Sequence, residues 1–268
     1  MKILFISDVY FPRVNGVSTS IRTFVAQMQN IGHTVHLIAP DYGVKTPDEA
    51  WIKRIPTPFV AHYLGLKLAH LLNVPVVETY HTFFEDYLHH YLPIIPKSIA
   101  RSLARFVSRR QCNAVDAIIS PSQPMLDVLR DYGVKSKANV VPTGLQAHSF
   151  EKANGENFRE KYGIALDRPM GLFVGRVAFE KNISFLLRTW VEVIKNQPDA
   201  LLVIAGEGPA EKSLHALGKA LNLEDNLKFI GYLDRETELN ACYAAADVFV
   251  FSSLSETQGL VLLEAMAQ

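Results

Sequence analysis

Cysteine and long apolar runs are scarce in this chain of 268 residues. Its two cysteines, Cys112 and Cys242, lie far apart without Cys-x-x-Cys spacing, so we expect neither a disulfide framework nor a thiolate metal site. No apolar run approaches the ~18 residues of a membrane span. The opening "ILFIS" after Met1-Lys2 is too short for a signal peptide and is soon followed by Asp8. We therefore expect a cytoplasmic protein.

A net charge is also lacking, because 27 Lys and Arg side chains balance 27 Asp and Glu side chains. Without a global field the chain shows no preference for nucleic acid, and any electrostatic specificity must be local. A hydrophobic share of 49% over this length is enough for a sizeable core. Length alone predicts one large domain or two of ~100 to 150 residues, and we start from two.

Two phosphate-binding motifs are missing as well. The sequence has no GxxxxGK[ST] segment, which excludes the phosphate-loop ATPases, and no Asp-x-Asp motif that would hold a metal-bound diphosphate. Gly206-x-Gly208 is weak evidence for a dinucleotide site, because Glu211 occupies the third glycine position of that fingerprint. We therefore expect side-chain cations and helix N-termini to hold any phosphate group.

The first half of the chain alternates short, β-branched apolar segments with helical patterns. Segments that are apolar on both faces indicate buried parallel strands, and several of the helical patterns open with Ser or Pro near the expected cap. The expected strands are residues 2–7, 33–40, 74–81, 117–120 and 139–144, and the expected helices are 18–30, 59–73, 98–112 and 122–132.

The alternation restarts after a polar stretch at residues 146–168, which we interpret as an interdomain connection. The sequence therefore predicts an α/β fold of two domains, 1–150 and 151–268, with helices on both faces of each sheet and a cleft between the sheets. Ligands in such folds bind outside the carboxyl ends of the strands. The expected strands of the second domain are 171–176, 200–208, 227–231 and 248–253, and its helices are 183–195, 210–221 and 236–245.

Gly16 follows the first expected strand, where Asn15-Gly16 make a turn and Val17-Ser18 open a helix. A glycine there lets a ligand approach the backbone, and the N–H groups at the helix start favour an anion. A plain turn with a serine cap explains the stretch equally well.

Arg176 and Lys181 lie on one loop, "GRVAFEKN", after the strand pattern that ends at Val174. Two cations at a strand end suit a diphosphate, because guanidinium grips oxygens in pairs while ammonium supplies a mobile point charge. We favour phosphate binding here over a surface decoration.

His81, Glu85 and His89 are spaced i, i+4, i+8, which on one continuous helix would form a stripe able to hold a metal. His81 ends a strand pattern, however, and the aromatic run "TFFEDY" need not continue a single helix. We therefore expect His81 to be a polar group that points into the cleft from a strand end.

A basic amphipathic helix is expected between Ile94 and Ala114, a stretch without any acidic residue. Its cations accumulate opposite an apolar stripe of Ile99, Leu103 and Phe106. Such a helix can lie against anionic lipid; the alternative is a solvated face on a helix that packs on its own domain. The cations are Lys97, Arg101, Arg105, Arg109 and Arg110.

The segment "SETQGLVLLEAMA" places Glu256 at the end of the last expected strand and Glu264 in the helix that follows. The backbone N–H groups of Gln258, Gly259 and Leu260 would point from the helix start toward a ligand, and carboxylates accept hydrogen bonds from hydroxyl groups. Sugars offer many hydroxyls. An acidic first turn explains Glu256 through the helix dipole but leaves the interval to Glu264 unexplained.

Together these segments resemble the retaining glycosyltransferases of the two-Rossmann (GT-B) architecture, in particular the group-1 or GT4 family. "ETYHTFFEDYLHHY" and Thr257-Gln258 look most like the members that glucosylate diacylglycerol, although many relatives have Phe in place of Gln258. The segments in the family's order are "VNGVSTSIRTF", "IGHTVHLIAP", "ETYHTF", "VPTGL", "LFVGRVAFEKN", "LLVIAGEGP", "LKFIGYL" and "SETQGLVLLEAMA".

The resemblance implies a role for each site residue. Glu256 and Glu264 would be the family's E-x7-E pair, the first beside the donor sugar and the second toward the nucleotide ribose. Arg176 and Lys181 would hold the diphosphate, and His81 would face the reacting sugar; with Glu256 these three are the expected catalytic residues. The remaining expected donor contacts are Gly16 and Val17 under the diphosphate, Tyr232 near the base, and Gln258, Gly259 and Leu260.

The implied reaction is transfer of a hexose to a lipid hydroxyl such as that of diacylglycerol, with UDP-glucose as the leading donor. Neither a cofactor nor a metal is expected. The expected partners are the nucleotide sugar, a lipid acceptor and an anionic membrane on the inner face of the plasma membrane. The alternatives are a mannosyltransferase that uses GDP-mannose, a sugar-nucleotide epimerase, and a nucleotide-sugar-binding or membrane-docking module without turnover.

Two departures from the family pattern predict an incomplete fold with a truncated second domain. After Ile55-Pro56 the chain passes directly to "TPFVAHYLG", where relatives have a further strand, helix and strand. The sequence also stops at Gln268, before the family's last strands and closing helix. The sequence does not distinguish deleted segments from omitted ones.

Overall fold

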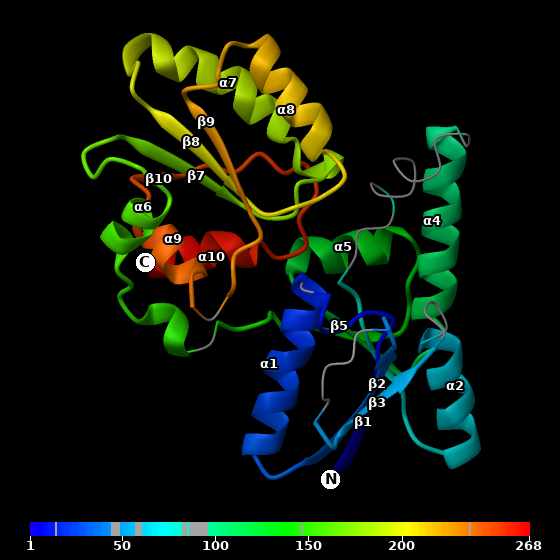
Figure 1. Ribbon diagram of the computed structural model, residues 1–268. Helices are drawn as coiled ribbons and strands as arrows, with labels where there is room; N and C mark the ends of the chain where they lie inside the picture. The colour runs from blue at the N-terminus through cyan, green and yellow to red at the C-terminus, as the bar shows by residue number, and fades with distance from the viewer. Residues whose placement is uncertain are drawn as a thin grey trace. The chain divides into compact units, whose positions relative to one another are not determined.

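The computed structural model describes residues 1–13, 15–43, 49–56, 61–81, 85, 96–145, 147–235 and 237–268 (Figure 1). The chain divides into two compact units, Met1–Gly144 and Leu145–Gln268, and each unit has its own hydrophobic clusters. The expected boundary near residue 150 lies a few residues after this division.

The first unit contains two three-stranded parallel sheets. One has the order β1-β2-β3, made of β1 (Lys2–Ile6), β2 (Thr34–Pro40) and β3 (Ile52–Ile55). The other has the order β4-β5-β6, made of β4 (Val77–Thr79), β5 (Ala117–Ser120) and β6 (Lys137–Val140). Within the described residues, β1 and β4 each pair on one side only. Both therefore have an open edge.

Helices connect these strands, as parallel pairing requires. Helix α1 packs Ile21 and Val25 against Leu37 of β2, and α5 packs Met125 and Leu129 against Ile118 of β5. The described helices of this unit are α1 (Gly16–Asn30), α2 (Ala61–Leu72), α4 (Lys97–Cys112) and α5 (Gln123–Asp131).

Helix α2 bridges the two sheets of the first unit. Its first N–H, from Ala61, donates to Oδ1 of Asp8 just after β1, over 3.0 Å. At the same end, His62 lies 3.3 Å from Glu78 of β4. One turn later, Leu66 packs against the cluster that contains Ile118 of β5. Helix α2 thus contacts both sheets of the first unit.

The second unit holds a four-stranded parallel sheet of order β10-β7-β8-β9. All residues of its central strands, β7 (Met170–Val174) and β8 (Leu201–Ala205), are buried. The neighbouring strands are β9 (Leu227–Gly231) and the short β10 (Val248–Phe249). Strands that are apolar on both faces are covered on both faces, as the sequence predicts.

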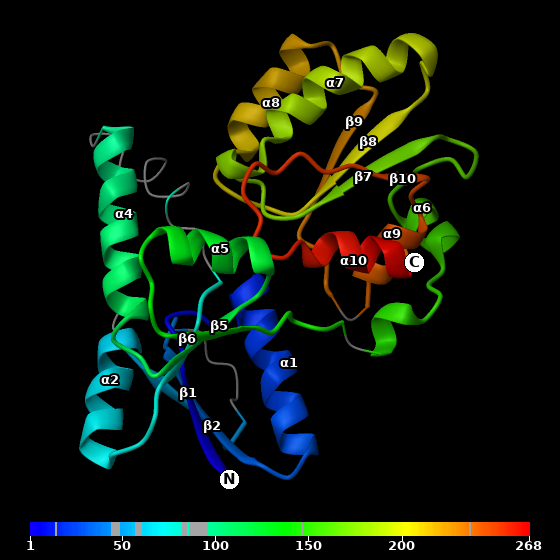
Figure 2. The ribbon, with the colours of Figure 1, turned by 180° about the vertical axis from the view of Figure 1, so that it is seen from behind.

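Alternate side chains of these strands enter two separate cores. Figures 1 and 2 show the helices that cover the two faces of this sheet. Phe173 and Ile204 pack under α7 (Ile183–Asn196) and α8 (Glu211–Ala220), while Leu172 and Val203 pack against α6 (Gly155–Lys161) and α9 (Leu239–Ala244). The period of two along a strand produces this division. The remaining elements are α10 (Leu260–Ala267) and the 3-10 turns η1 (Ala147–Phe150) and η2 (Phe179–Lys181).

Candidate functional site

Two loops at the carboxyl ends of β7 and β10 are tied together in the second unit. The hydroxyl of Ser252 donates to the backbone carbonyls of Lys181 and Asn182, over 3.1 and 3.0 Å. The backbone N–H of Leu254 donates to the carbonyl of Glu180 over 3.4 Å. These bonds hold the η2 turn next to the segment that carries Glu256.

Lys181 and Glu256 meet across these loops. Lys181 Nζ lies 2.8 Å from Glu256 Oε2, and the ammonium also lies 6.0 Å from the centre of the Phe251 ring. Neither side chain is fully exposed. Two residues that the sequence assigns to one donor site, 75 positions apart, are therefore brought into direct contact.

Arg176 occupies the same loop and faces a different carboxylate. Its Nη1 lies 3.9 Å from Oε1 of Glu180, whose side chain is only 3% exposed. This Oε1 has no hydrogen-bond partner in the described part of the chain. The sequence interpretation missed Glu180, although its position four residues after Arg176 was the available signal.

The pair Gly206-x-Gly208 has a packing explanation. Gly206 has φ +133°, and a Cβ there would lie 2.0 Å from the carbonyl oxygen of Gly175. A Cβ at Gly208 would lie 2.3 Å from the carbonyl of Val177. The loops after β7 and β8 therefore approach one another more closely than any side chain allows. The two glycines place the loop that carries Arg176 and are not a dinucleotide fingerprint.

Helix α10 begins at a glycine that its backbone requires. Gly259 has φ +74°, in the left-handed region, and a Cβ there would lie 3.1 Å from Leu262 Cδ1. No side chain caps this helix start. Gln258 and Leu260, beside Gly259, are half-buried. The geometry of this helix start does not test the donor contacts expected of Gln258, Gly259 and Leu260.

Glu264 lies on α10 and is buried, unlike Glu256. Its Oε1 accepts a hydrogen bond from Arg235, and its Oε2 accepts one from the hydroxyl of Tyr243 over 2.9 Å. Burial, and then the charge of Glu264, raise the pKa of Tyr243, so that its hydroxyl remains a donor. Both carboxylate oxygens of Glu264 are already bonded, and its expected contact with a ribose stays a prediction.

Tyr232, the residue expected near a nucleobase, follows β9 and is half exposed. Its backbone N–H lies 3.4 Å from Oε1 of Glu207, a residue of the loop after β8. It therefore lies at the same, carboxyl edge of the sheet as Arg176 and Lys181.

In the first unit, helix α1 begins with an ordinary capping box between Asn15 and Ser18. Asn15 accepts from the N–H of Ser18 over 2.9 Å, and the Ser18 hydroxyl accepts from the N–H of Asn15 over 2.9 Å. A Cβ on Gly16 would meet nothing within 4 Å, so the protein itself does not require a glycine there. The half-buried Val17 follows in the first turn.

His81 lies just after β4 and is partly buried. Burial lowers the pKa of its imidazole to about 4, so the ring is neutral near pH 7. A neutral imidazole can both donate and accept a hydrogen bond. The role implied for His81 beside a sugar is untested.

The structure does not test the His81, Glu85, His89 stripe as a whole, because His89 lies outside the described residues. Glu85 accepts from Arg105 Nη2 over 2.7 Å and from the hydroxyl of Tyr132 over 2.5 Å. Burial acts to raise the pKa of Glu85, but these bonds and the charges of Arg105 and Arg101 outweigh it and lower the pKa. Among the described residues no group of three His, Cys, Asp or Glu could hold a metal, and His89 lies outside them.

Helix α4 buries small residues and exposes its large apolar ones, and the expected contact of this helix with lipid stays a prediction. Its core face is Ala100, Ala104, Ser108 and Cys112, and the Ser108 hydroxyl lies 2.8 Å from the hydroxyl of Tyr80. The large apolar side chains Ile99, Leu103, Phe106 and Val107 are exposed.

The cations of α4 divide into two groups. Arg105 and, at 3.7 Å, Arg101 pair with Glu85 of the same unit. Arg109 and Arg110, one or two turns further along, are exposed. The side chain of Lys97 lies outside the described part. Of the helices that the structure describes, none combines the length and apolarity needed to cross a bilayer.

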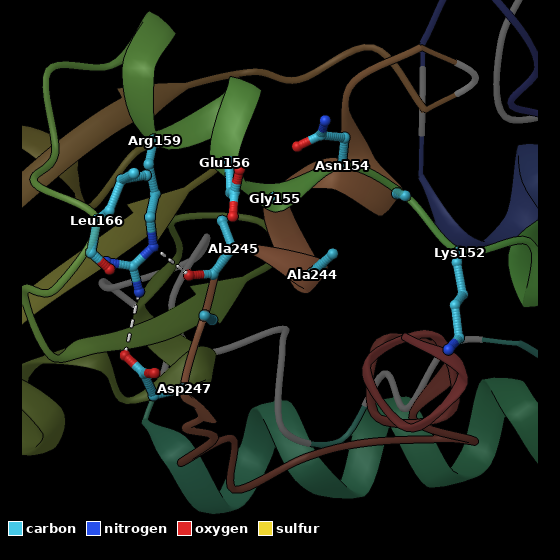
Figure 3. A pocket seen from close by; sticks show the side chains of 11 residues that line it. Lys152, Asn154, Gly155, Glu156, Arg159, Leu166, Ala244, Ala245 and Asp247 are labelled. Atoms are coloured by element: carbon cyan, nitrogen blue, oxygen red, sulfur yellow. Dashed lines mark hydrogen bonds and ion pairs between the residues drawn. The ribbon is translucent and has the colours of Figure 1, made fainter.

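A pocket of about 610 Å³ lies at the opposite, amino end of the sheet in the second unit (Figure 3). Arg159 lines it and makes structural bonds: Nε donates to Ala245 O over 2.8 Å, Nη2 donates to Asp247 over 3.1 Å, and Nη1 donates to three carbonyls. Asp247 also accepts from the N–H of Met170 over 2.8 Å. This guanidinium joins the segments that precede β7 and β10.

The fold defines the class of protein. Sucrose-phosphate synthase from Thermosynechococcus elongatus superimposes with a TM-score of 0.80 at 20% identity, covering 99% of this chain and 78% of that one. Anabaena HepE in complex with UDP-glucose gives a TM-score of 0.77 at 17% identity, covering 100% of this chain and 78% of that one. At these identities the likeness concerns the fold alone, and the fold is that of the GT-B glycosyltransferases.

The sequence comparisons define the family. Residues 154–268 match the model of "Glycosyl transferases group 1", and residues 55–148 match "Glycosyltransferase Family 4". The alpha-monoglucosyldiacylglycerol synthase of Streptococcus pneumoniae is 33% identical over 310 aligned positions, which cover 100% of this chain and 69% of that protein. The enzyme of the same name from Acholeplasma laidlawii is 25% identical, covering 100% of this chain and 78% of that protein. The chain belongs to the group 1 (family 4) glycosyltransferases.

Proposed function

We propose that this glycosyltransferase moves a glucosyl group from UDP-glucose to the hydroxyl of diacylglycerol or a similar lipid, with retention of anomeric configuration. Two relatives that align with the whole chain carry the name alpha-monoglucosyldiacylglycerol synthase, and this supports the sugar and the acceptor. HepE, which shares the fold, has been solved with UDP-glucose, and this supports the donor.

The observation that carries the proposal is the contact of Lys181 with Glu256, on a loop that also carries Arg176. In the reaction, the bond from the sugar C1 to the diphosphate breaks and a bond from C1 to the acceptor oxygen forms on the same face. Negative charge then grows on the leaving diphosphate. Arg176 and Lys181 would stabilise this charge more strongly in the transition state than in the ground state.

Glu256 would orient the sugar through its hydroxyl groups and would not attack C1. Its ion pair with Lys181 keeps both side chains in place until a donor replaces the pair with a phosphate oxygen and a sugar hydroxyl. The acceptor proton would pass to the departing phosphate oxygen, so that no nucleophile of the enzyme is required. Donor contacts of Gly16, Val17, Tyr232, Gln258, Gly259, Leu260 and Glu264, and a sugar contact of His81, remain predictions.

We also propose that catalysis needs neither a cofactor nor a divalent metal. Two side-chain cations on one loop supply the charge that a metal would otherwise bring to the diphosphate. Activity measured with excess EDTA should equal activity measured with Mg²⁺. A requirement for Mg²⁺ or Mn²⁺ would contradict this part of the proposal.

The exposed stripe of α4 supports contact with a membrane. Ile99, Leu103 and Phe106 present apolar surface, while Arg109 and Arg110 add positive charge at the end of the same helix. In liposome sedimentation, vesicles with anionic lipid should bind more protein than neutral vesicles, and Arg109→Gln with Arg110→Gln should lose most of that difference. Arg188→Gln with Lys195→Gln, on the exposed side of α7, is the control.

The central experiment is incubation with UDP-, GDP- and ADP-sugars and lipid acceptors, followed by mass analysis of products. The expected result is a hexosyl lipid from UDP-glucose, reduced ~10²- to 10³-fold in Lys181→Ala and Glu256→Ala. A mannosyl lipid from GDP-mannose, an epimerised nucleotide sugar, or binding without any product would each replace the proposal by one of the alternatives.

A further inference from the structure

A buried carboxylate, that of Glu180, lies in the sequence between the two cations of the candidate site, Arg176 and Lys181. Glu180 is one residue before Lys181 and its Oε1 is 3.9 Å from Nη1 of Arg176. The same oxygen accepts no hydrogen bond within the described residues, and the side chain is almost fully shielded from water. Burial of a carboxylate oxygen without a donor is costly, so its position calls for an explanation other than fold stability.

The backbone of Glu180 is fixed on both sides. Its carbonyl accepts from the N–H of Leu254, and the N–H of the next residue, Lys181, donates to the carbonyl of Ala178 over 3.1 Å. Arg176, in contrast, is 48% exposed and has a long side chain. Of the two partners, the carboxylate is therefore the fixed point and the guanidinium is the part that can adjust.

We propose that Glu180 is a positioning residue for Arg176. Its buried carboxylate limits the orientations of the exposed guanidinium, so that the fork of N–H groups stays directed at the place where the leaving diphosphate gains charge. This inference rests on the proposed function, in which Arg176 binds that diphosphate. Glu180 itself touches neither sugar nor phosphate, which separates its role from that of Glu256.

A positioning role has a kinetic signature that a purely structural role lacks. Without the negative charge of Glu180, the loop becomes more positive, and a ground-state diphosphate binds as tightly as before or more tightly. The orientation of Arg176 is lost, however, and orientation matters most in the transition state. The catalytic rate should therefore fall while affinity for the nucleotide does not.

The test compares Glu180→Gln, which keeps the shape of the side chain and removes its charge, with Glu192→Gln as a matched control. Glu192 is an exposed partner of Lys195 on α7, outside the candidate site. We expect Glu180→Gln to lower kcat roughly 10- to 100-fold with the Kd for UDP, from calorimetry, unchanged or lower. Glu192→Gln should change neither. An unaltered kcat in Glu180→Gln, or a parallel loss of kcat and UDP affinity, overturns the inference.

A second variant guards against misfolding. Glu180→Asp keeps the charge but withdraws it from Arg176 by one methylene, and we expect it to recover part of the rate that Glu180→Gln loses. Combining Glu180→Gln with Arg176→Ala should cost no more activity than Arg176→Ala alone, because Glu180 acts through Arg176. Independent, multiplying losses would refute the assignment.

A readout without turnover distinguishes failure of this inference from failure of the proposed function. The Nε–H signal of Arg176 in ¹⁵N-labelled protein, assigned by its loss in Arg176→Lys, should report a restricted side chain in the unmodified protein and a mobile one in Glu180→Gln. Absence of product with every donor would reject the proposed function alone. An Arg176 signal that is equally mobile in both proteins would reject the role of Glu180 alone.

Discussion

Two glycines of this chain differ in whether their surroundings leave room for a side chain, and the effect of this difference can be measured. A Cβ at Gly206 would meet the carbonyl of Gly175 at 2.0 Å, whereas a Cβ at Gly16 would meet nothing. We expect Gly206→Ala to destabilise the protein by about 2–4 kcal/mol, because backbone cannot give way as a side chain can. Gly16→Ala should leave stability within about 0.5 kcal/mol and lower donor turnover.

Urea unfolding and initial rates with the donor found in the product panel test this pair of variants. A stable Gly206→Ala would mean that the loops after β7 and β8 can separate without loss. A fully active Gly16→Ala would remove the first unit's glycine from the list of donor contacts.

The partly buried imidazole of His81 gives stability a defined pH dependence. Its pKa is about 4 in the folded protein, against an ordinary 6.5, so the unfolded chain binds a proton first as the pH falls. The contribution of His81 is therefore fully present above pH 6.5 and is lost between pH 6.5 and 4. Over that window the unmodified protein should lose on the order of 1–3 kcal/mol more stability than His81→Asn. Equal slopes in denaturant titrations at several pH values would contradict this expectation.

At the level of elements, Glu85 is one of the groups that hold α4 to its unit. Glu85 accepts from Arg105 on α4 and from Tyr132 after α5, and its removal leaves a buried tyrosine hydroxyl without its acceptor. We expect Glu85→Ala to cost about 1–3 kcal/mol, and the exposed Glu224→Ala to cost less than about 0.5 kcal/mol, in urea unfolding at pH 7. Because the pKa of Glu85 is lowered, the difference should shrink as the pH falls below 4.5. A difference independent of pH would point to packing alone.

The elements also mark where sequence patterns succeed and fail. The alternation of apolar strands and helices predicted β1, β2, β7 and β8 well, because buried parallel strands have a strong compositional signal. Strand β3 was missed since Lys53 and Arg54 interrupt its apolar pattern. The sequence indicated the apolar stripe of α4 but not its core face, because close packing there selects small residues such as Ala100 and Ala104.

The sequence predicted only part of the candidate site, because only some of its residues lie in recognisable short motifs. Arg176, Lys181 and Glu256 carry signals in short motifs, and the structure brings Lys181 to Glu256. Burial of Glu264 against Arg235 and Tyr243 depends on contacts between elements, which spacing along the chain does not record. Glu180 was overlooked because a carboxylate next to two cations reads as an ordinary surface charge until its burial is known.

For the molecule as a whole, the central strands of the second unit are better covered than the edge strands β1 and β4 of the first unit. All of β7 and β8 is buried, whereas Leu4 of β1 is 45% exposed and Val77 of β4 is 55% exposed. We expect amide hydrogen exchange in β8 to be slower than in β1 and β4 by roughly a factor of ten or more, because local opening is easier where few apolar contacts are lost. Mass spectrometry of peptides from both units would measure this. Equal protection from exchange in β1, β4 and β8 would show that the exposed side chains of β1 and β4 do not make local opening easier.

The open edges of β1 and β4 carry a practical consequence for handling the protein. Each pairs with another strand on one side only among the described residues, and Lys2 is the single charged residue within β1. Such an unpaired strand edge can pair with any extended polypeptide, including a neighbouring copy of the same chain. Light scattering by concentrated samples should therefore increase with time. An excess of a short, soluble, strand-forming peptide should slow this increase, because the peptide occupies the open strand edge first.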